Sequence, residues 1–198
     1  MPSPFFPMKN KYLYHAHISE SDFRLIMRYF ALDIEIIKIA ILTGISRQSL
    51  NKIIFAVRQR LAWQCEEENP LRMRSGNEEM IAFGILKHDD RICTQGFGLS
   101  AMDDLIALRH KWRVPERFHP YAGVIDVGSW KYYQISPELG EVQAFWGLTK
   151  ERLAKFRGLH RSMIYYHLKE SEYRYNHRHE SIYPLLLDLC RHPPLRLT

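Results

Sequence analysis

Hydrophobic residues in the first third of the chain recur at helical spacing, in runs that short polar segments separate. Ser19 opens the first run as a helix N-cap, followed by an acidic first turn. Phe23, Ile26, Met27 and Phe30 then fall on one side of a helix. This pattern predicts an amphipathic first helix that buries that side.

Two more helices are expected after a short break. Asp33 is suited to cap a second helix over Ile34–Leu42, and Gly44 is suited to end it in the left-handed conformation. Ser46 then caps a third helix that runs to about Cys65. A helix, a tight turn with glycine and a second helix together predict a helix-turn-helix module.

The third helix carries a polar face near its beginning. The apolar stripe that we expect to be buried comprises Leu50, Ile54, Val57 and Leu61. The opposite side presents residues of the types that contact bases and phosphates, namely Arg47, Gln48, Asn51 and Lys52. We predict that this face binds DNA. The alternative is a plain helical hairpin with a solvated polar face.

The rest of the chain mixes strand and helix patterns. Apolar runs predict strands at Met80–Lys87, Ile92–Phe97, Trp112–Pro115 and Lys131–Ile135. Helical spacing predicts helices that begin at Ser100, Gly140, Ser162 and Tyr183. Strands followed by helices indicate an α/β domain. We therefore expect a helix-turn-helix domain over residues 1–65, a linker over 66–77 and an α/β domain over 78–198.

The helix expected over residues 140–158 is basic in its second half. Val142, Phe145, Leu148 and Leu153 form its apolar side, with Trp146 and Phe156 beside them. The cations that follow are Lys150, Arg152, Lys155 and Arg157. They are a second candidate for DNA contact, and an ordinary amphipathic helix with a solvated basic face is the alternative.

Composition narrows the class of partner. The 198 residues carry a formal net charge of +6, which favours an anionic partner, nucleic acid before membrane. Three scattered cysteines fit neither a metal site nor a disulfide framework, so a reducing compartment is expected. The amino terminus does not resemble a signal peptide, and no apolar run is long enough to span a bilayer. We expect a cytoplasmic protein with no membrane partner.

The order of residues in several segments indicates a protein family more specifically than the spacing of apolar and polar residues does. Six segments carry a specific order of residues: Phe83–Lys87, Tyr121–Gly128, Phe145-Trp146-Gly147 with Lys150, Arg152–Gly158, Leu168-Lys169-Glu170 and Glu172–His179. In these segments the chain resembles insertion-sequence DDE transposases related to the Merlin group. The resemblance implies a helix-turn-helix module before an RNase H-like core, double-stranded DNA as partner and association with the nucleoid.

The resemblance also implies a catalytic site that has departed from the family pattern. Such enzymes use three carboxylates to hold two Mg²⁺ ions for phosphoryl transfer. Glu116 falls on the second acidic position, and Gln143, a neutral amide, falls on the third. The strand with the first acid is missing from the linker, so the core is truncated. Lys150 falls on the position at which the family has a basic residue that binds the substrate phosphate.

We therefore expect a DNA-binding protein of transposase type whose catalysis is lost or impaired. No cofactor is expected, apart from Mg²⁺ if the chain is active. The alternative is an active transposase with a divergent triad that recruits Asp103, Asp104, Glu138 or Glu141. A binding or structural protein without a DNA role is a third hypothesis. The oligomeric state stays open, with a homodimer as one option.

Overall fold

The computed structural model describes residues 10–14, 17–71, 79–137, 140–155 and 160–197. The chain divides into two compact units, one of residues 1–61 with 177–198 and one of residues 62–176. The domain boundary expected from the sequence lay in the linker and placed the carboxy-terminal segment in the second domain. The compact units divide instead inside a helix, and they place that segment with the amino-terminal residues.

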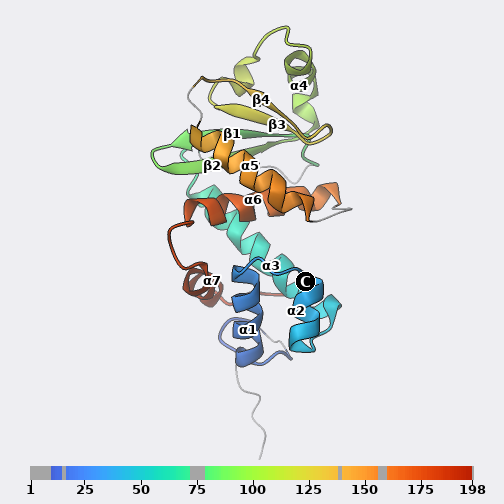
Figure 1. The fold of residues 1–198 in the computed structure, drawn as a ribbon, viewed down its shortest axis with the longest axis vertical. Coiled ribbons are helices and arrows are strands. Elements are labelled where there is room, and N and C mark those ends of the chain that lie inside the picture. The colour runs from blue at the N-terminus through green and yellow to red at the C-terminus, as the bar shows by residue number, and fades with distance from the viewer. Residues whose placement is uncertain (1–9, 15–16, 72–78, 138–139, 156–159, 198) are drawn as a thin grey trace, which may run out of the picture. The chain divides into compact units, whose positions relative to one another are not determined.

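The first unit is helical (Figure 1). Its helices are α1 (Glu20–Ala31), α2 (Ile36–Thr43), the first part of α3 (Arg47–Glu67) and α7 (Ile182–Arg191). α1 forms as predicted: the Ser19 side chain accepts a hydrogen bond from the Asp22 amide, and the expected apolar residues are buried. α7 packs against α1. Leu195 also exchanges backbone hydrogen bonds with Tyr12 and Tyr14, so the two ends of the described chain lie side by side in this unit.

The second unit is built on a four-stranded sheet in the order β2-β1-β3-β4, and neighbouring strands are antiparallel throughout. The strands are β1 (Ala82–His88), β2 (Arg91–Phe97), β3 (Gly123–Asp126) and β4 (Lys131–Gln134). Its remaining elements are η1 (Leu99–Ala101), α4 (Met102–Arg109), η2 (Glu116–Phe118), α5 (Gly140–Ala154) and α6 (Arg161–Asn176). The expected mixture of helices and sheet is confirmed.

Successive side chains along each strand point to opposite faces of the sheet, and both faces carry buried residues. Phe83 and Ile85 of β1 pack with α5 and α6 on one face, in a core that contains Phe145 and Leu168. The opposite face packs with α4 and η2, in a core that contains Ala82, Val124, Leu105, Phe118 and Tyr121. Figure 1 shows α4 on one side of the sheet and α5 and α6 on the other. Gly84 permits this packing, since a Cβ there would lie 2.5 Å from the ring of Tyr121.

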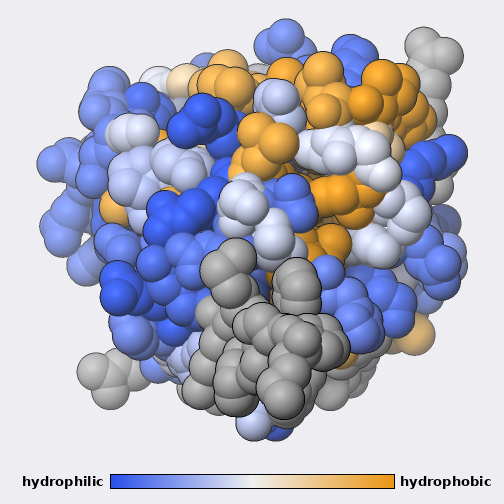
Figure 2. All heavy atoms as spheres, turned by 90° about the horizontal axis from the view of Figure 1, so that it is seen from below, coloured by the Kyte–Doolittle hydropathy of each residue, from blue (hydrophilic) through white to orange (hydrophobic). Residues whose placement is uncertain are grey.

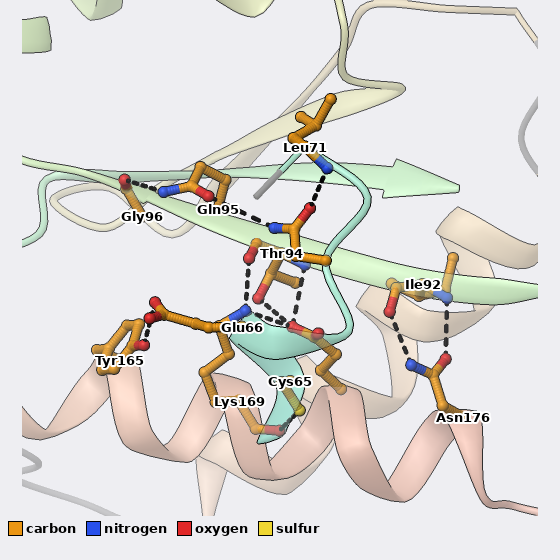
Figure 3. Close-up of polar contacts among 12 residues, drawn as sticks. Cys65, Glu66, Leu71, Ile92, Thr94, Gln95, Gly96, Tyr165, Lys169 and Asn176 are labelled. Carbon is orange, nitrogen blue, oxygen red and sulfur yellow. Dashed lines mark hydrogen bonds and ion pairs between the residues drawn. The ribbon is translucent and has the colours of Figure 1, made fainter. Parts of the chain in front are cut away.

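The contact between α6 and β2 is polar as well as apolar (Figure 3). Lys169 Nζ donates to the Thr94 carbonyl at 2.6 Å and pairs with the Glu172 carboxylate at 3.0 Å. That carboxylate also accepts from the amide and the hydroxyl of Thr94. Lys169 and Glu172 are buried, so each charge needs the other to offset its lost hydration. The pair therefore fixes how α6 lies on β2.

Further polar contacts hold α6 in the same position. Asn176 accepts from the Ile92 amide and donates to the Ile92 carbonyl, at 2.9 and 2.8 Å. The Tyr165 hydroxyl donates to the Glu66 carboxylate in the last turns of α3 (Figure 3). Glu68 forms an ion pair with Arg91 at 2.9 Å. The described start of the expected linker is thus a structural part of the second unit, while residues 72–77 lie outside the described residues.

Three predictions of local structure are wrong. Asp33 does not cap α2, since it takes a φ of 55° and Glu35 is the N-cap. Ser100 does not cap α4, which begins after the turn η1. No strand forms over residues 112–115, because the Trp112 amide bonds back to the Ala107 carbonyl at the end of α4 instead of to a strand. Among the described residues, no helix combines the length and apolar character that crossing a bilayer requires.

Candidate nucleic-acid interface

The link between α2 and α3 is a tight turn whose conformation the local sequence determines. Gly44 takes the left-handed conformation, with φ 70° and ψ 4°, and its amide bonds to the Ala40 carbonyl. The Thr43 hydroxyl donates to the Ile39 carbonyl at 2.7 Å. Ser46 caps α3 by accepting from the Ser49 amide at 3.2 Å. The predicted roles of Gly44 and Ser46 are confirmed, and the turn sets where α3 begins.

The first turns of α3 expose the predicted polar row. The side chains on the inner side of this helix are buried, as expected for Leu50, Ile54, Val57 and Leu61. The exposed residues of the row are Arg47, Gln48, Asn51 and Lys52. They lie one turn apart or side by side, and therefore share one face of the helix. Two cations and two amides on this face can donate to phosphates and to base edges.

The outer side of α2 is apolar rather than polar. Ile41 is 78% exposed, and Ile37 and Leu42 are at least half exposed. Figure 2 shows hydrophobic residues gathered on part of the face seen there, next to hydrophilic ones. Lys38, the cation of this helix, forms an exposed ion pair with Glu35 at 3.4 Å. The side chains suited to bind an anion thus come from α3.

The basic residues of α5 do not form the continuous surface that we expected. Lys150 and Lys155 are exposed, whereas Arg152 is buried. The Arg152 guanidinium forms an ion pair with Glu170 and donates to the Ser171 hydroxyl and the His167 carbonyl. Arg152 therefore joins α5 to α6 and is unavailable to DNA. Arg157 lies outside the described residues.

The apolar side of α5 is largely as predicted. Val142, Phe145, Trp146 and Leu153 are buried, and Leu148 is 57% exposed. The buried side of the helix includes Thr149, and its neighbour Leu148 therefore lies on the exposed side. Phe156 lies outside the described residues.

The positions that the resemblance marked as catalytic lie on two different elements. Glu116 is exposed on η2, and Gln143 is exposed on α5, as is Lys150. Of the other acids considered, Asp104 pairs with Arg117 at 2.9 Å and Glu141 with Lys87 at 2.8 Å. Asp103 is exposed on α4, and Glu138 lies outside the described residues. Within the described part of the chain, no group of three or more His, Cys, Asp or Glu is placed to hold a metal ion.

A cavity of about 460 Å³ opens beside the amino-terminal end of α5. Its apolar wall includes Leu86, Tyr121 and Val142, and its polar side chains include Lys87 and Glu141. These last two form an ion pair with each other at 2.8 Å, so their charges offset one another at the cavity wall. Among the described residues that line it, Glu141 is the one carboxylate, whereas two Mg²⁺ ions require several converging carboxylates.

Two features of the second unit escaped the sequence analysis. Asp126 is fully buried at the end of β3, and Arg109 of α4 binds both of its carboxylate oxygens. The sequence did contain a signal for Asp126, because this acid ends an apolar run that forms a strand. Trp112, by contrast, is 72% exposed in the turn after α4, where the sequence analysis expected a strand over Trp112–Pro115.

The described residues therefore offer an exposed polar row on α3, exposed Lys150 on α5 with exposed Lys155 directly after that helix, and no assembled acidic site. Comparisons of the chain with protein-family models, with curated proteins and with solved structures gave no match.

Proposed function

We propose that this chain is a DNA-binding protein of transposase type that binds double-stranded DNA with the first turns of α3. The observation that carries the proposal is the exposed row of Arg47, Gln48, Asn51 and Lys52 behind a capped turn. In this proposal α2, the turn and α3 act as a helix-turn-helix module whose α3 enters the major groove. The guanidinium and amide groups then contact base edges, and Lys52 contacts a phosphate.

Charge supports this choice of partner. The chain has a formal net charge of +6. Among the described residues, Arg47 and Lys52 take part in no ion pair, so their charges remain available to phosphates. A protein that neutralises phosphates releases counterions, so binding should weaken steeply as salt rises. We place such a protein in the cytoplasm at the nucleoid, either as a monomer or as a homodimer.

We further propose that the second unit is a truncated RNase H-like core that has lost its chemistry. Two divalent ions a few ångströms apart repel each other, and carboxylates offset that repulsion. Gln143 supplies a neutral amide at one expected ligand position, and Glu116 alone supplies a matched acid. One carboxylate cannot hold a metal pair beside a phosphate.

Duplex binding is testable by fluorescence anisotropy with labelled DNA over a series of salt concentrations. We expect Arg47→Ala and Lys52→Ala each to weaken binding and to reduce the magnitude of the salt slope by about one. Arg191→Ala, which removes an exposed cation from α7, is the matched control and should bind like the unchanged protein. The proposal fails if the protein binds no duplex at low salt, or if the three variants are indistinguishable.

Gln48→Ala and Asn51→Ala test the role of the amides. Selection from a pool of random duplexes should return a preferred site for the unchanged protein. Loss of an amide that reads a base should relax the preference at one position of that site, at a cost of about 1–3 kcal/mol. An unchanged preference would restrict the amides to backbone contacts.

Catalysis requires a separate experiment. The purified chain is incubated with Mn²⁺ and with oligonucleotide duplexes that carry the sequences flanking its gene. We expect neither cleavage nor strand transfer, and we expect Gln143→Glu alone not to restore them. Cleavage that disappears in Glu116→Ala would instead establish an active transposase with a divergent set of acids.

A further inference from the structure

An exposed indole projects from the turn after α4. Trp112 is 72% exposed, and its ring stacks on the His110 ring at a centroid distance of 4.9 Å and an interplanar angle of 17°. The backbone beneath it is fixed, because the amides of Lys111 and Trp112 both donate to carbonyls of α4 at 3.1 Å. The positive φ of Lys111, 56°, turns the chain at this point. A large aromatic surface is therefore held rigidly towards solvent.

Cations flank this indole. Lys111 and Arg113 are exposed on either side of it, and neither forms an ion pair with another described residue. Two acids near the turn are already neutralised, since Asp104 pairs with Arg117 and Asp126 pairs with Arg109, whereas Asp103 and Glu116 are exposed. The turn therefore presents positive charge around a flat aromatic ring.

A second indole lies at the turn joined to the end of α4. The Asp126 carboxylate binds Arg109 of α4 and also accepts from the Ser129 hydroxyl at 2.7 Å, so both segments meet at one group. Trp130, the next residue, is 38% exposed and stacks on Trp146, with ring centroids 6.4 Å apart. Exposed Lys131 follows it. Because Trp146 belongs to α5, which packs on the other face of the sheet from α4, Trp130 and Lys131 are not counted with Trp112. We call the side chains of His110, Lys111, Trp112 and Arg113 the tryptophan surface.

We propose that the tryptophan surface binds single-stranded nucleic acid by stacking unpaired bases on Trp112. Indole faces bind bases of any sequence by stacking, and neighbouring Lys and Arg side chains bind the phosphates between them. His110 supports the inner face of the Trp112 ring and leaves the outer face for a base. A duplex presents no free base face, so this contact differs in kind from the proposed duplex contact of α3 and does not depend on it.

The experiment compares a labelled oligodeoxythymidylate with a labelled duplex of equal length, using the full chain. We expect Trp112→Ala to weaken binding of the single strand by about tenfold or more and Trp112→Phe to weaken it less, with duplex affinity unchanged. Lys111→Ala with Arg113→Ala should weaken single-strand binding and reduce its salt dependence. Trp63→Ala, which removes a 53% exposed indole from α3, is the matched control and should leave both affinities unchanged.

Any other outcome contradicts either the tryptophan surface or the proposed duplex contact of α3. Single-strand binding that is absent, or equally strong in Trp112→Ala and Trp63→Ala, overturns the tryptophan surface and leaves the duplex proposal intact. Trp112→Ala that weakens single strand and duplex alike also overturns it, since the indole would then serve a general backbone contact or a protein contact. Trp112-dependent single-strand binding without any duplex binding supports the tryptophan surface and overturns the proposed role of α3.

Discussion

Arg109 binds the buried carboxylate of Asp126 with two parallel hydrogen bonds, from Nε to Oδ2 at 2.8 Å and from Nη2 to Oδ1 at 2.9 Å. The Gly128 amide and the Ser129 hydroxyl donate to the same carboxylate. One acid thereby joins the end of α4 to the turn between β3 and β4. Burial alone would raise the pKa of Asp126, but the hydrogen bonds from Arg109 and Ser129 outweigh burial and lower it.

Asp126→Asn should destabilise the protein in a pH-dependent way. A carboxyl whose pKa is lowered in the folded state contributes stability above its unfolded pKa, about 4, and loses it as pH falls through the folded pKa. We expect a loss of about 1–3 kcal/mol in the free energy of unfolding at pH 7, shrinking steadily below about pH 4. Urea denaturation at a series of pH values measures it. Asp103→Asn, on the exposed side of α4, is the control, and a loss independent of pH would contradict the prediction.

The left-handed conformation of Gly44 predicts that alanine substitutions at Gly44 and at Gly147 change stability in opposite directions. A Cβ at Gly44 would meet nothing within 4 Å, so Gly44→Ala carries only the cost of a left-handed φ, about 1–2 kcal/mol. A Cβ at Gly147 also meets nothing, but this residue is helical, so Gly147→Ala should stabilise by about 0.5–1 kcal/mol. Thermal denaturation should therefore shift in opposite directions for the two variants. Equal shifts would show that the turn does not need its observed conformation.

The basic residues of α5 should separate into a structural one and a binding one. Arg152→Ala removes an ion-pair partner of the buried Glu170 carboxylate, which keeps its ion pair with Arg174 at 2.9 Å, and should cost about 3 kcal/mol of unfolding free energy. Lys150→Ala should change stability by less than about 0.5 kcal/mol and lower duplex affinity at low salt. Guanidinium denaturation and anisotropy measure the two effects. If Lys150→Ala binds DNA as before, the exposed side of α5 is a solvated surface.

Lys169 and Glu172 should be strongly coupled in a double-mutant cycle. Lys169→Met or Glu172→Leu alone leaves one buried charge unpaired and should cost about 3–5 kcal/mol. The double variant removes both charges and should cost less than the sum of the single changes. Urea denaturation of the four proteins gives the coupling energy. Additive costs would mean that the two side chains act independently in solution.

The three cysteines should be inert in the native protein. All three are buried, and burial raises the pKa of Cys93 to about 11 and that of Cys190 to about 12, with that of Cys65 also raised. The thiolate is the reactive form, so alkylation at pH 8 should be slow until the chain unfolds. Mass spectrometry after iodoacetamide treatment, with and without urea, measures this. Rapid modification of Cys93 without urea would contradict its burial.

Elements defined by local chemistry were predictable from the sequence. Ser19 and Ser46 cap helices, Gly44 ends one, and the hairpin of β1 and β2 follows from two apolar runs around a polar turn. Each signal lies within a few residues of the element that it defines. The exposed row on α3 was equally local, because helical spacing alone separates it from the buried stripe.

Features that depend on distant partners were not predictable. In the sequence Lys169 and Glu172 look like a solvated pair on α6, but they are buried against β2, where Thr94 accepts from one and donates to the other. Arg152 has the spacing of a basic surface but turns inward to Glu170. A charged residue at a given helical position does not reveal whether the facing element carries its counter-ion.

The first unit is formed by two segments that lie far apart in the sequence, and this has a consequence for synthesis on the ribosome. α1 buries its apolar face partly against α7, which follows the whole second unit in the sequence. At about 5–20 residues per second, residues 62–176 take on the order of ten seconds to translate. During that time α1 lacks the contacts that it makes with α7 in the folded unit. The first unit can therefore assemble completely only after the whole second unit and α7 have been synthesised.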